Sequence, residues 1–190
     1  MIATPEAPEA PADERKRPSA SRNLVEWVVI LGGALLVAFV VKTFLFQAFF
    51  IPSPSMVPTL QVDDRVLVNK LSYRLHDVNR GDVVVFERLP DEAGTIRDLI
   101  KRVVAVGGDT IESRDDVIYV NDQPVDEPYR ATSSLGGPVA RRTISEGQVF
   151  VMGDNRTNSS DSRVFGPVDQ DRIVGRAFVK IWPLGSFRLL

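Results

Sequence analysis

The chain of 190 residues contains no cysteine and a single histidine, His76. Without cysteine it can form neither a disulfide nor a thiolate zinc site, and it lacks a cysteine nucleophile. One histidine is also too few for a multi-histidine metal site. A Ser-His-Asp triad would have to use His76, which lies among polar neighbours in Tyr73-Arg-Leu-His-Asp77 and is interpreted as a surface residue.

A strong excess of charge of either sign is also absent. The formal net charge is −2, and the lysines and arginines are scattered along the sequence, so no nucleic-acid partner is expected. Hydrophobic residues make up 44% of the chain and charged residues 25%, which is typical of a folded protein. The length suits one domain with an appendage.

The N-terminal part divides into two segments. Residues 1–22 are rich in Ala, Pro and Glu and have little apolar surface to bury, so we predict a disordered tail. From Leu24 to Val41 the sequence is almost continuously apolar. A helix of about 18 residues spans about 27 Å, close to the thickness of a hydrocarbon core. Residues 23–44 are therefore predicted to form a transmembrane helix.

The orientation of this helix follows from the basic residues before it, Arg15, Lys16, Arg17 and Arg22. By the positive-inside rule they place the tail in the cytoplasm and residues 45–190 outside, as a single-pass protein of the plasma membrane. A cleavable signal peptide is the alternative. We favour a retained signal anchor, because the apolar run is long for a signal peptide and no Ala-x-Ala site follows it.

Beyond residue 51 short β-branched runs alternate with Gly, Asp, Asn and Pro, which predicts an all-β domain. The predicted strands are Arg65–Asn69, Asp82–Phe86, Lys101–Val106, Val117–Val120, Gln148–Met152 and Ile173–Trp182. Asn121-Asp122 is typical of a two-residue hairpin turn. Glu127–Arg142 has no hydrophobic period and is predicted to be an exposed loop.

A candidate nucleophile, Ser55, lies in the proline-rich stretch Pro52-Ser-Pro-Ser-Met-Val-Pro58. Proline fixes φ and restricts the residue before it, so this stretch can hold a hydroxyl in one direction. The stretch follows residues 43–51, whose four phenylalanines suit a segment at the membrane surface. The alternative is an ordinary Ser/Pro linker between an anchor and a domain.

A serine nucleophile needs a base, and with His76 set aside the candidates are carboxylates and lysines. Lysine can accept a proton only when it is neutral, and burial in apolar surroundings lowers its pKa. Lys101 lies in a strand pattern next to Leu99-Ile100 and before Val103-Val-Ala-Val106. Periodicity alone also allows an outward-facing Lys101, and Lys70, at the end of another predicted strand, is the rival base.

A third segment, Gly153–Gly166, follows a predicted strand and is dense in hydrogen-bonding side chains. Such a segment is either a turn or part of a site. It matches neither a phosphate-binding loop nor a calcium-binding EF-hand loop.

These motifs occur in order along one chain and resemble those of bacterial type I signal peptidases. They are Pro52–Leu60, Gly81–Phe86, Lys101-Arg102 running into Gly107-Gly-Asp109, and Gly153-Asp-Asn-Arg156 with Ser159, Asp161, Ser162, Arg163 and Gly166. The resemblance covers nearly all of the chain after the tail. One departure is Pro54, which stands where the family frequently has glycine.

The resemblance assigns roles to individual residues. It implies that Ser55 is the nucleophile and Lys101 the general base, with the Ser53 hydroxyl and the Ser55 backbone N–H as the oxyanion hole. It implies that Ser159 orients the lysine. Two ion pairs, Arg102 with Asp154 and Asp161 with Arg163, would support the site without taking part in the chemistry.

The function that the resemblance implies is that of a membrane-bound serine endopeptidase. Such an enzyme removes signal peptides from exported preproteins, cuts after small residues of the Ala-x-Ala type and forms an acyl-enzyme. Its partners are preproteins and the lipid bilayer, with no metal and no cofactor. The fold would be mainly β, with an antiparallel catalytic domain at residues 45–190 and a reduced second subdomain at about 111–147.

Two other classes of function are open on the residues alone. A self-cleaving repressor-type regulator also uses a Ser-Lys pair, but it would be cytoplasmic, and the apolar run from Leu24 argues against it. A membrane-anchored binding module would use the Ser/Pro stretch only as a linker. Loss or retention of function in a Ser55→Ala variant separates that module from an enzyme.

Overall fold

The computed structural model describes residues 20–41, 45–88 and 97–190. The chain divides into an N-terminal unit that ends at Phe39 and a domain, Val40–Leu190. Helix α1, Ala20–Val40, begins inside the predicted tail, whose other residues lie outside the described ones. Within the three described ranges, no helix combines the length and the apolarity needed to cross a membrane.

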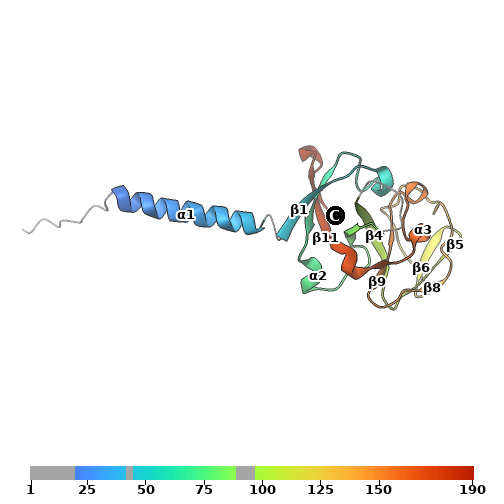
Figure 1. Cartoon of the computed structure of the whole chain (residues 1–190). Helices are drawn as coiled ribbons and strands as arrows, with labels where there is room; N and C mark the ends of the chain where they lie inside the picture. Colours follow the sequence, from blue (N-terminus) through green and yellow to red (C-terminus); the bar gives the residue numbers. More distant parts are fainter. Residues whose placement is uncertain (1–19, 42–44, 89–96) are drawn as a thin grey trace, which may run out of the picture. The chain divides into compact units, whose positions relative to one another are not determined.

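The domain consists of short strands and single helical turns, several of which are labelled in Figure 1. The strands are β1 Phe46–Phe50, β2 Arg65–Asn69, β3 Val83–Glu87, β4 Asp98–Val106, β5 Thr110–Arg114, β6 Val117–Val120, β7 Gln123–Pro124, β8 Arg142–Thr143, β9 Gln148–Met152, β10 Val168–Asp169, β11 Ile173–Trp182 and β12 Arg188–Leu189. The helical turns are η2 Pro54–Met56, α2 Ser72–Leu75, η3 Arg156–Asn158, α3 Ser162–Phe165, η4 Gln170–Arg172 and η5 Leu184–Ser186. The prediction of a mainly β domain is confirmed.

The larger sheet has the strand order β1-β2-β11-β3-β4-β9-β10, with β12 paired to β11. Its strand pairs are all antiparallel. In β3, Val83 and Val85 pack into one apolar cluster and Val84 and Phe86 into another. Because apolar residues cover both faces at this strand, its sequence is a continuous apolar run without polar alternation.

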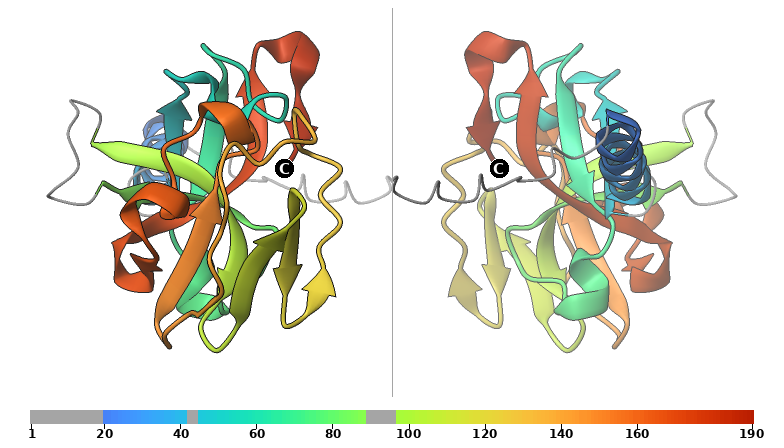
Figure 2. Two further views of the ribbon diagram at one scale, coloured as in Figure 1. Left: turned by 90° about the vertical axis from the view of Figure 1, so that its right-hand side faces the viewer. Right: turned by 90° about the vertical axis from the view of Figure 1, so that its left-hand side faces the viewer.

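The smaller sheet, β7-β6-β5-β8, is also antiparallel and lies beside β9 in Figure 2. Ile111 and Ile118 from this sheet share a core with Phe150 and Met152 of β9. The turn between β6 and β7 has positive φ at both Asn121 (53°) and Asp122 (62°), as the predicted hairpin turn requires. The sheet falls in the part of the chain where a second subdomain was predicted.

The prediction of an exposed loop at Glu127–Arg142 is only partly right. The segment is irregular until β8, but Leu135 and Val139 are buried in the core of the smaller sheet. The Glu127 side chain is only 3% exposed. Hydrophobic periodicity does not detect such burial, because the segment is neither helix nor strand and its apolar residues have no fixed spacing.

Candidate active site

Ser55 lies in the single turn η2, directly after the larger sheet's edge strand β1. Pro54 occupies the first position of the turn, and Ser53 before it is extended (φ −133°, ψ 154°). Met56 and Leu60, both fully buried, join the apolar cluster beneath the turn and hold it against the sheet. The result is a turn with a fixed position and a serine that is 7% exposed.

Lys101 of β4 reaches this serine. Its Nζ donates hydrogen bonds to Ser55 Oγ (2.9 Å) and to the Ile100 carbonyl oxygen (3.0 Å). Ser53 Oγ lies 3.3 Å from Ser55 Oγ. Lys101 is 3% exposed, so it does not face outward from the strand. The structure therefore brings the predicted nucleophile, the predicted base and the predicted oxyanion hydroxyl together.

The loop after β9 supports the turn from the other side. Asn155 donates from its backbone N–H to the Ser55 carbonyl oxygen (3.0 Å) and from its side chain to the Pro54 carbonyl oxygen (3.1 Å). Gly153 packs so closely that an added Cβ would lie 2.5 Å from the Ser55 carbonyl oxygen and would also contact Ser159 Oγ. Only glycine fits at position 153 without movement of the turn or the loop.

Ser159 lies beside Gly153, but it does not make the contact with Lys101 that its predicted role suggests. No hydrogen bond joins its buried hydroxyl to Lys101 in the described part of the chain, and the hydroxyl contributes instead to the lowered pKa of Asp161. The orienting role therefore stays a prediction.

The first implied ion pair, Arg102 with Asp154, is present. The guanidinium donates to both carboxylate oxygens, from Nε to Oδ1 (2.9 Å) and from Nη2 to Oδ2 (2.7 Å), and from Nη1 to the Gly81 carbonyl oxygen (2.9 Å). The Thr59 hydroxyl donates to Asp154 Oδ2 (2.5 Å), and the guanidinium carbon lies 4.0 Å from the centre of the Tyr129 ring. Asp154 is fully buried, so it depends on these donors to compensate for its lost hydration.

The second implied pair, Asp161 with Arg163, is also present. Arg163 donates from Nε (2.8 Å) and Nη2 (2.7 Å) to the two carboxylate oxygens, and the Gly153 N–H donates to Oδ2 (3.0 Å). Burial raises the pKa of Asp161, but the hydrogen bonds from Arg163 and Gly153 outweigh it, and the net effect is a lowered pKa. Arg163 also donates to the carbonyl oxygens of Arg156 (2.7 Å) and Leu135.

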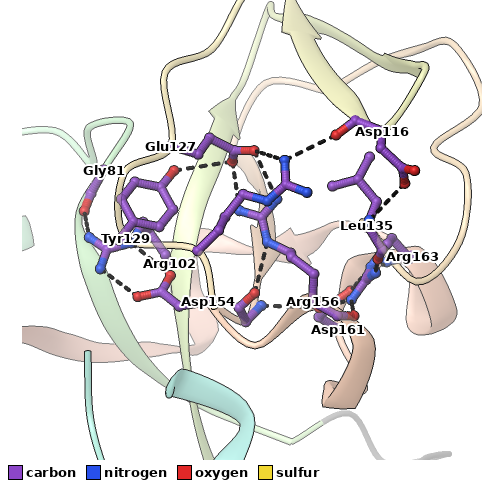
Figure 3. Close-up of polar contacts among 12 residues, drawn as sticks. Gly81, Arg102, Asp116, Glu127, Tyr129, Leu135, Asp154, Arg156, Asp161 and Arg163 are labelled. Carbon is purple, nitrogen blue, oxygen red and sulfur yellow. Dashed lines mark hydrogen bonds and ion pairs between the residues drawn. The ribbon is translucent and has the colours of Figure 1, made fainter. Parts of the chain in front are cut away.

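Glu127 and Arg156 form a third buried pair, which the sequence did not reveal (Figure 3). Arg156 donates from Nη1 and Nη2 to the two Glu127 carboxylate oxygens (3.0 and 2.6 Å) and from Nε to the Gly153 carbonyl oxygen (2.8 Å). Tyr129 and Arg130 donate to the same carboxylate (3.2 and 3.4 Å). Glu127 thus connects the segment after β7 to the loop after β9, which contacts the turn that carries Ser55. The pair joins residues 29 apart in an aperiodic segment, so no local pattern indicates it.

The other candidate bases do not reach the serine. His76 is exposed, its ring meets Tyr73 edge-on, and its Nδ1 lies 2.9 Å from the Asp77 carbonyl oxygen, which confirms its interpretation as a surface residue. Lys70 follows β2, and within the described ranges no hydrogen bond joins it to Ser55. The same residues contain no group of His, Asp and Glu side chains able to hold a metal. The arrangement thus offers a buried hydroxyl and a buried amine in direct contact, a combination suited to serine-based acyl transfer.

Comparison with known proteins gives a consistent assignment. The family model described as signal peptidase, peptidase S26, matches residues 24–182. A probable signal peptidase I-2 of Synechocystis is 40% identical over 83% of this chain and 72% of its own length. Signal peptidase I of Leptolyngbya laminosa is 36% identical over 95% of this chain and 90% of its own. A crystal structure of a signal peptidase I from Enterococcus faecalis aligns with a TM-score of 0.46 and 30% identity, over 53% of this chain and 97% of that one. The family model, which matches more than half of the chain, and the two sequence relatives show that the chain belongs to the signal peptidase I family of serine peptidases.

Proposed function

We propose that this chain removes signal peptides from exported preproteins, with Ser55 as the nucleophile and Lys101 as the general base. The observation that carries the proposal is the 2.9 Å contact between Lys101 Nζ and Ser55 Oγ, in a site where both residues are buried. Such a distance is short enough for direct proton transfer.

The first half of the reaction forms an acyl-enzyme. Neutral Lys101 takes the hydroxyl proton of Ser55, and the oxygen attacks the scissile carbonyl carbon of the preprotein. The Ser53 hydroxyl and the Ser55 backbone N–H stabilise the negative oxygen of the tetrahedral intermediate. The intermediate then collapses, the peptide C–N bond breaks, and the Lys101 ammonium protonates the departing amine.

The second half releases the signal peptide. Lys101, neutral again, takes a proton from water as the water attacks the Ser55 ester. The C–O bond to Ser55 breaks, and the proton returns from Lys101 to the serine oxygen. Burial favours this cycle because an amine that is 3% exposed has lost most of the hydration that stabilises its charged form.

The substrate preference and the membrane topology are proposals that rest on the sequence. Cleavage after small residues of the Ala-x-Ala type follows from the family resemblance. The apolar run Leu24–Val41 and the basic residues before it suggest an anchor with its N-terminus in the cytoplasm and residues 45–190 outside. Protease added to intact spheroplasts should then digest the domain, whereas full protection would contradict this topology.

Cleavage of a synthetic signal peptide tests the function. The full chain in neutral detergent should cut an Ala-x-Ala peptide after the second alanine, and Ser55→Ala protein should not. A peptide with bulky residues at both alanine positions serves as the matched substrate control. Equal cleavage of the two peptides would contradict the proposed preference, and no cleavage by wild-type protein would contradict the proposed activity.

A further inference from the structure

A cavity of about 390 Å³ lies between α2 and the η4 turn and includes none of the candidate active-site residues. Its polar lining consists of Lys70, Tyr73, Arg74, Gln170 and Asp171, and its remaining lining is apolar. The volume lies within the range of small-molecule sites and is large enough for a phospholipid headgroup.

Two cations line this cavity, Lys70 and Arg74, and neither forms an ion pair within the described part of the domain. Most basic side chains of the domain form ion pairs, and even Arg172, in the η4 turn, pairs with Asp169 (3.9 Å). In residues 45–88 and 97–190, by contrast, no carboxylate pairs with Lys70 or Arg74. Asp171 also lines the cavity, so the charged lining sums to one positive charge.

The cavity lies beside the point where the chain enters the domain. The Lys70 backbone N–H donates to the carbonyl oxygen of Leu45 (2.9 Å), the residue before β1. Leu45 belongs to the phenylalanine-rich segment that follows the apolar N-terminal run. Leu75, at the end of α2, is 81% exposed. Cationic and apolar side chains are therefore adjacent in a protein whose family is membrane-associated.

We propose that this cavity binds the phosphodiester of an anionic phospholipid headgroup through Lys70 and Arg74. Arg can donate two parallel hydrogen bonds to phosphate oxygens, and Lys acts as a compact positive charge. A phosphodiester carries a single negative charge, which matches the single net charge of the lining. The inference rests on the membrane association of the family and not on the roles of Ser55 and Lys101.

Native mass spectrometry of the full chain in neutral detergent provides the test. The chain is titrated with short-chain phosphatidylglycerol, with phosphatidylcholine of the same chain length, and with inorganic phosphate. Because binding is measured without substrate, the result is independent of the proposed peptidase activity. We expect phosphatidylglycerol to bind more tightly than phosphatidylcholine, whose choline group compensates the phosphate charge.

Charge-matched variants locate the site. A double variant, Lys70→Gln with Arg74→Gln, should weaken phosphatidylglycerol binding about thirtyfold, because each of the two cations contributes about fivefold near a lipid surface. Arg114→Gln with Arg141→Gln removes the same charge from the smaller sheet and should leave the affinity within about twofold. Asp171→Asn removes the carboxylate from the cavity and should strengthen binding, so it tests the site even if the double variant fails to fold.

The inference is overturned by any of three results. These are equal binding of the two lipids, wild-type affinity in the double variant, or weakened binding in Asp171→Asn. Binding of inorganic phosphate without phosphatidylglycerol would also reject the lipid as the ligand.

Discussion

The turn that carries Ser55 and the loop that follows β9 meet at the same site, but different forces hold them. Prolines and the burial of Met56 and Leu60 fix the turn. Buried charges fix the loop, through the pairs Arg102–Asp154, Arg156–Glu127 and Arg163–Asp161. The two segments touch through backbone contacts, such as that from Asn155 to the Ser55 carbonyl oxygen.

This difference affects how each segment tolerates change. Loss of apolar area weakens a turn by degrees, roughly in proportion to the area lost. A buried ion pair adds little net stability while intact, but removal of one partner leaves the other charge buried without compensation. Single substitutions in the loop should therefore cost more stability than the small net contribution of its intact ion pairs suggests.

The largest effect is expected at the contact between the two reacting groups. Ser55→Ala and Lys101→Ala should each lower kcat by about 10⁴-fold or more, because nucleophile and base act as a unit. Both variants should keep the wild-type circular dichroism spectrum. Ser145→Ala, at an exposed serine before β9, should keep full turnover. Near-wild-type turnover by either active-site variant would remove the dyad assignment.

The next largest effect concerns stability and probes the charged loop. Glu127→Gln should destabilise the domain by about 3 kcal/mol, because it leaves the buried Arg156 guanidinium without its carboxylate. Glu112→Gln is the matched control, since Glu112 pairs with exposed arginines on the smaller sheet and such pairs contribute little. Urea unfolding followed by circular dichroism measures both. Equal stability of the two variants would show that the loop does not depend on its buried charges.

A smaller effect is expected in acid. The pKa of Asp161 is lower in the folded domain, so its contribution to stability is present above the unfolded pKa of about 3.9 and is lost as the pH falls through the lower folded value. Asp161→Asn should flatten the decline of stability below about pH 4. An unchanged slope in Asp161→Asn would contradict the linkage.

The smallest effect is expected at Ser159. Ser159→Ala should lower kcat about fivefold, the worth of about one hydrogen bond, with KM nearly unchanged, if the hydroxyl orients Lys101 during the reaction. A rise in KM alone would reject the orienting role.

The sequence predicts the turn that carries Ser55 better than it predicts the charged loop after β9. Proline spacing indicates the turn, and β-branched runs give β2, β6, β9 and β11 with the observed bounds. β4 begins at Asp98, before the apolar run from which it was predicted, because pairing with β3 extends it past that run. The two-residue strands are too short for any periodic pattern. The charged loop is harder to predict, since the roles of Arg102, Asp154, Asp161 and Arg163 came from family resemblance alone.

Glu127 shows why local pattern is insufficient. Its importance comes from Arg156, a residue distant in sequence, and from the burial of both side chains. A carboxylate in an aperiodic segment is ordinarily a surface group, so composition and periodicity indicate the opposite of what the fold contains.

The central claim is that the Ser55 hydroxyl oxygen is the nucleophile and that Lys101, which contacts it, is its base. Rapid acid quench of wild-type chain during turnover of a signal-peptide ester, followed by proteolysis and mass spectrometry, tests it most directly. We expect an acyl group on the fragment that contains Ser55, absent in Ser55→Ala and formed far more slowly in Lys101→Ala. An acyl group on another residue, or an equal rate of its formation without Lys101, would contradict the account.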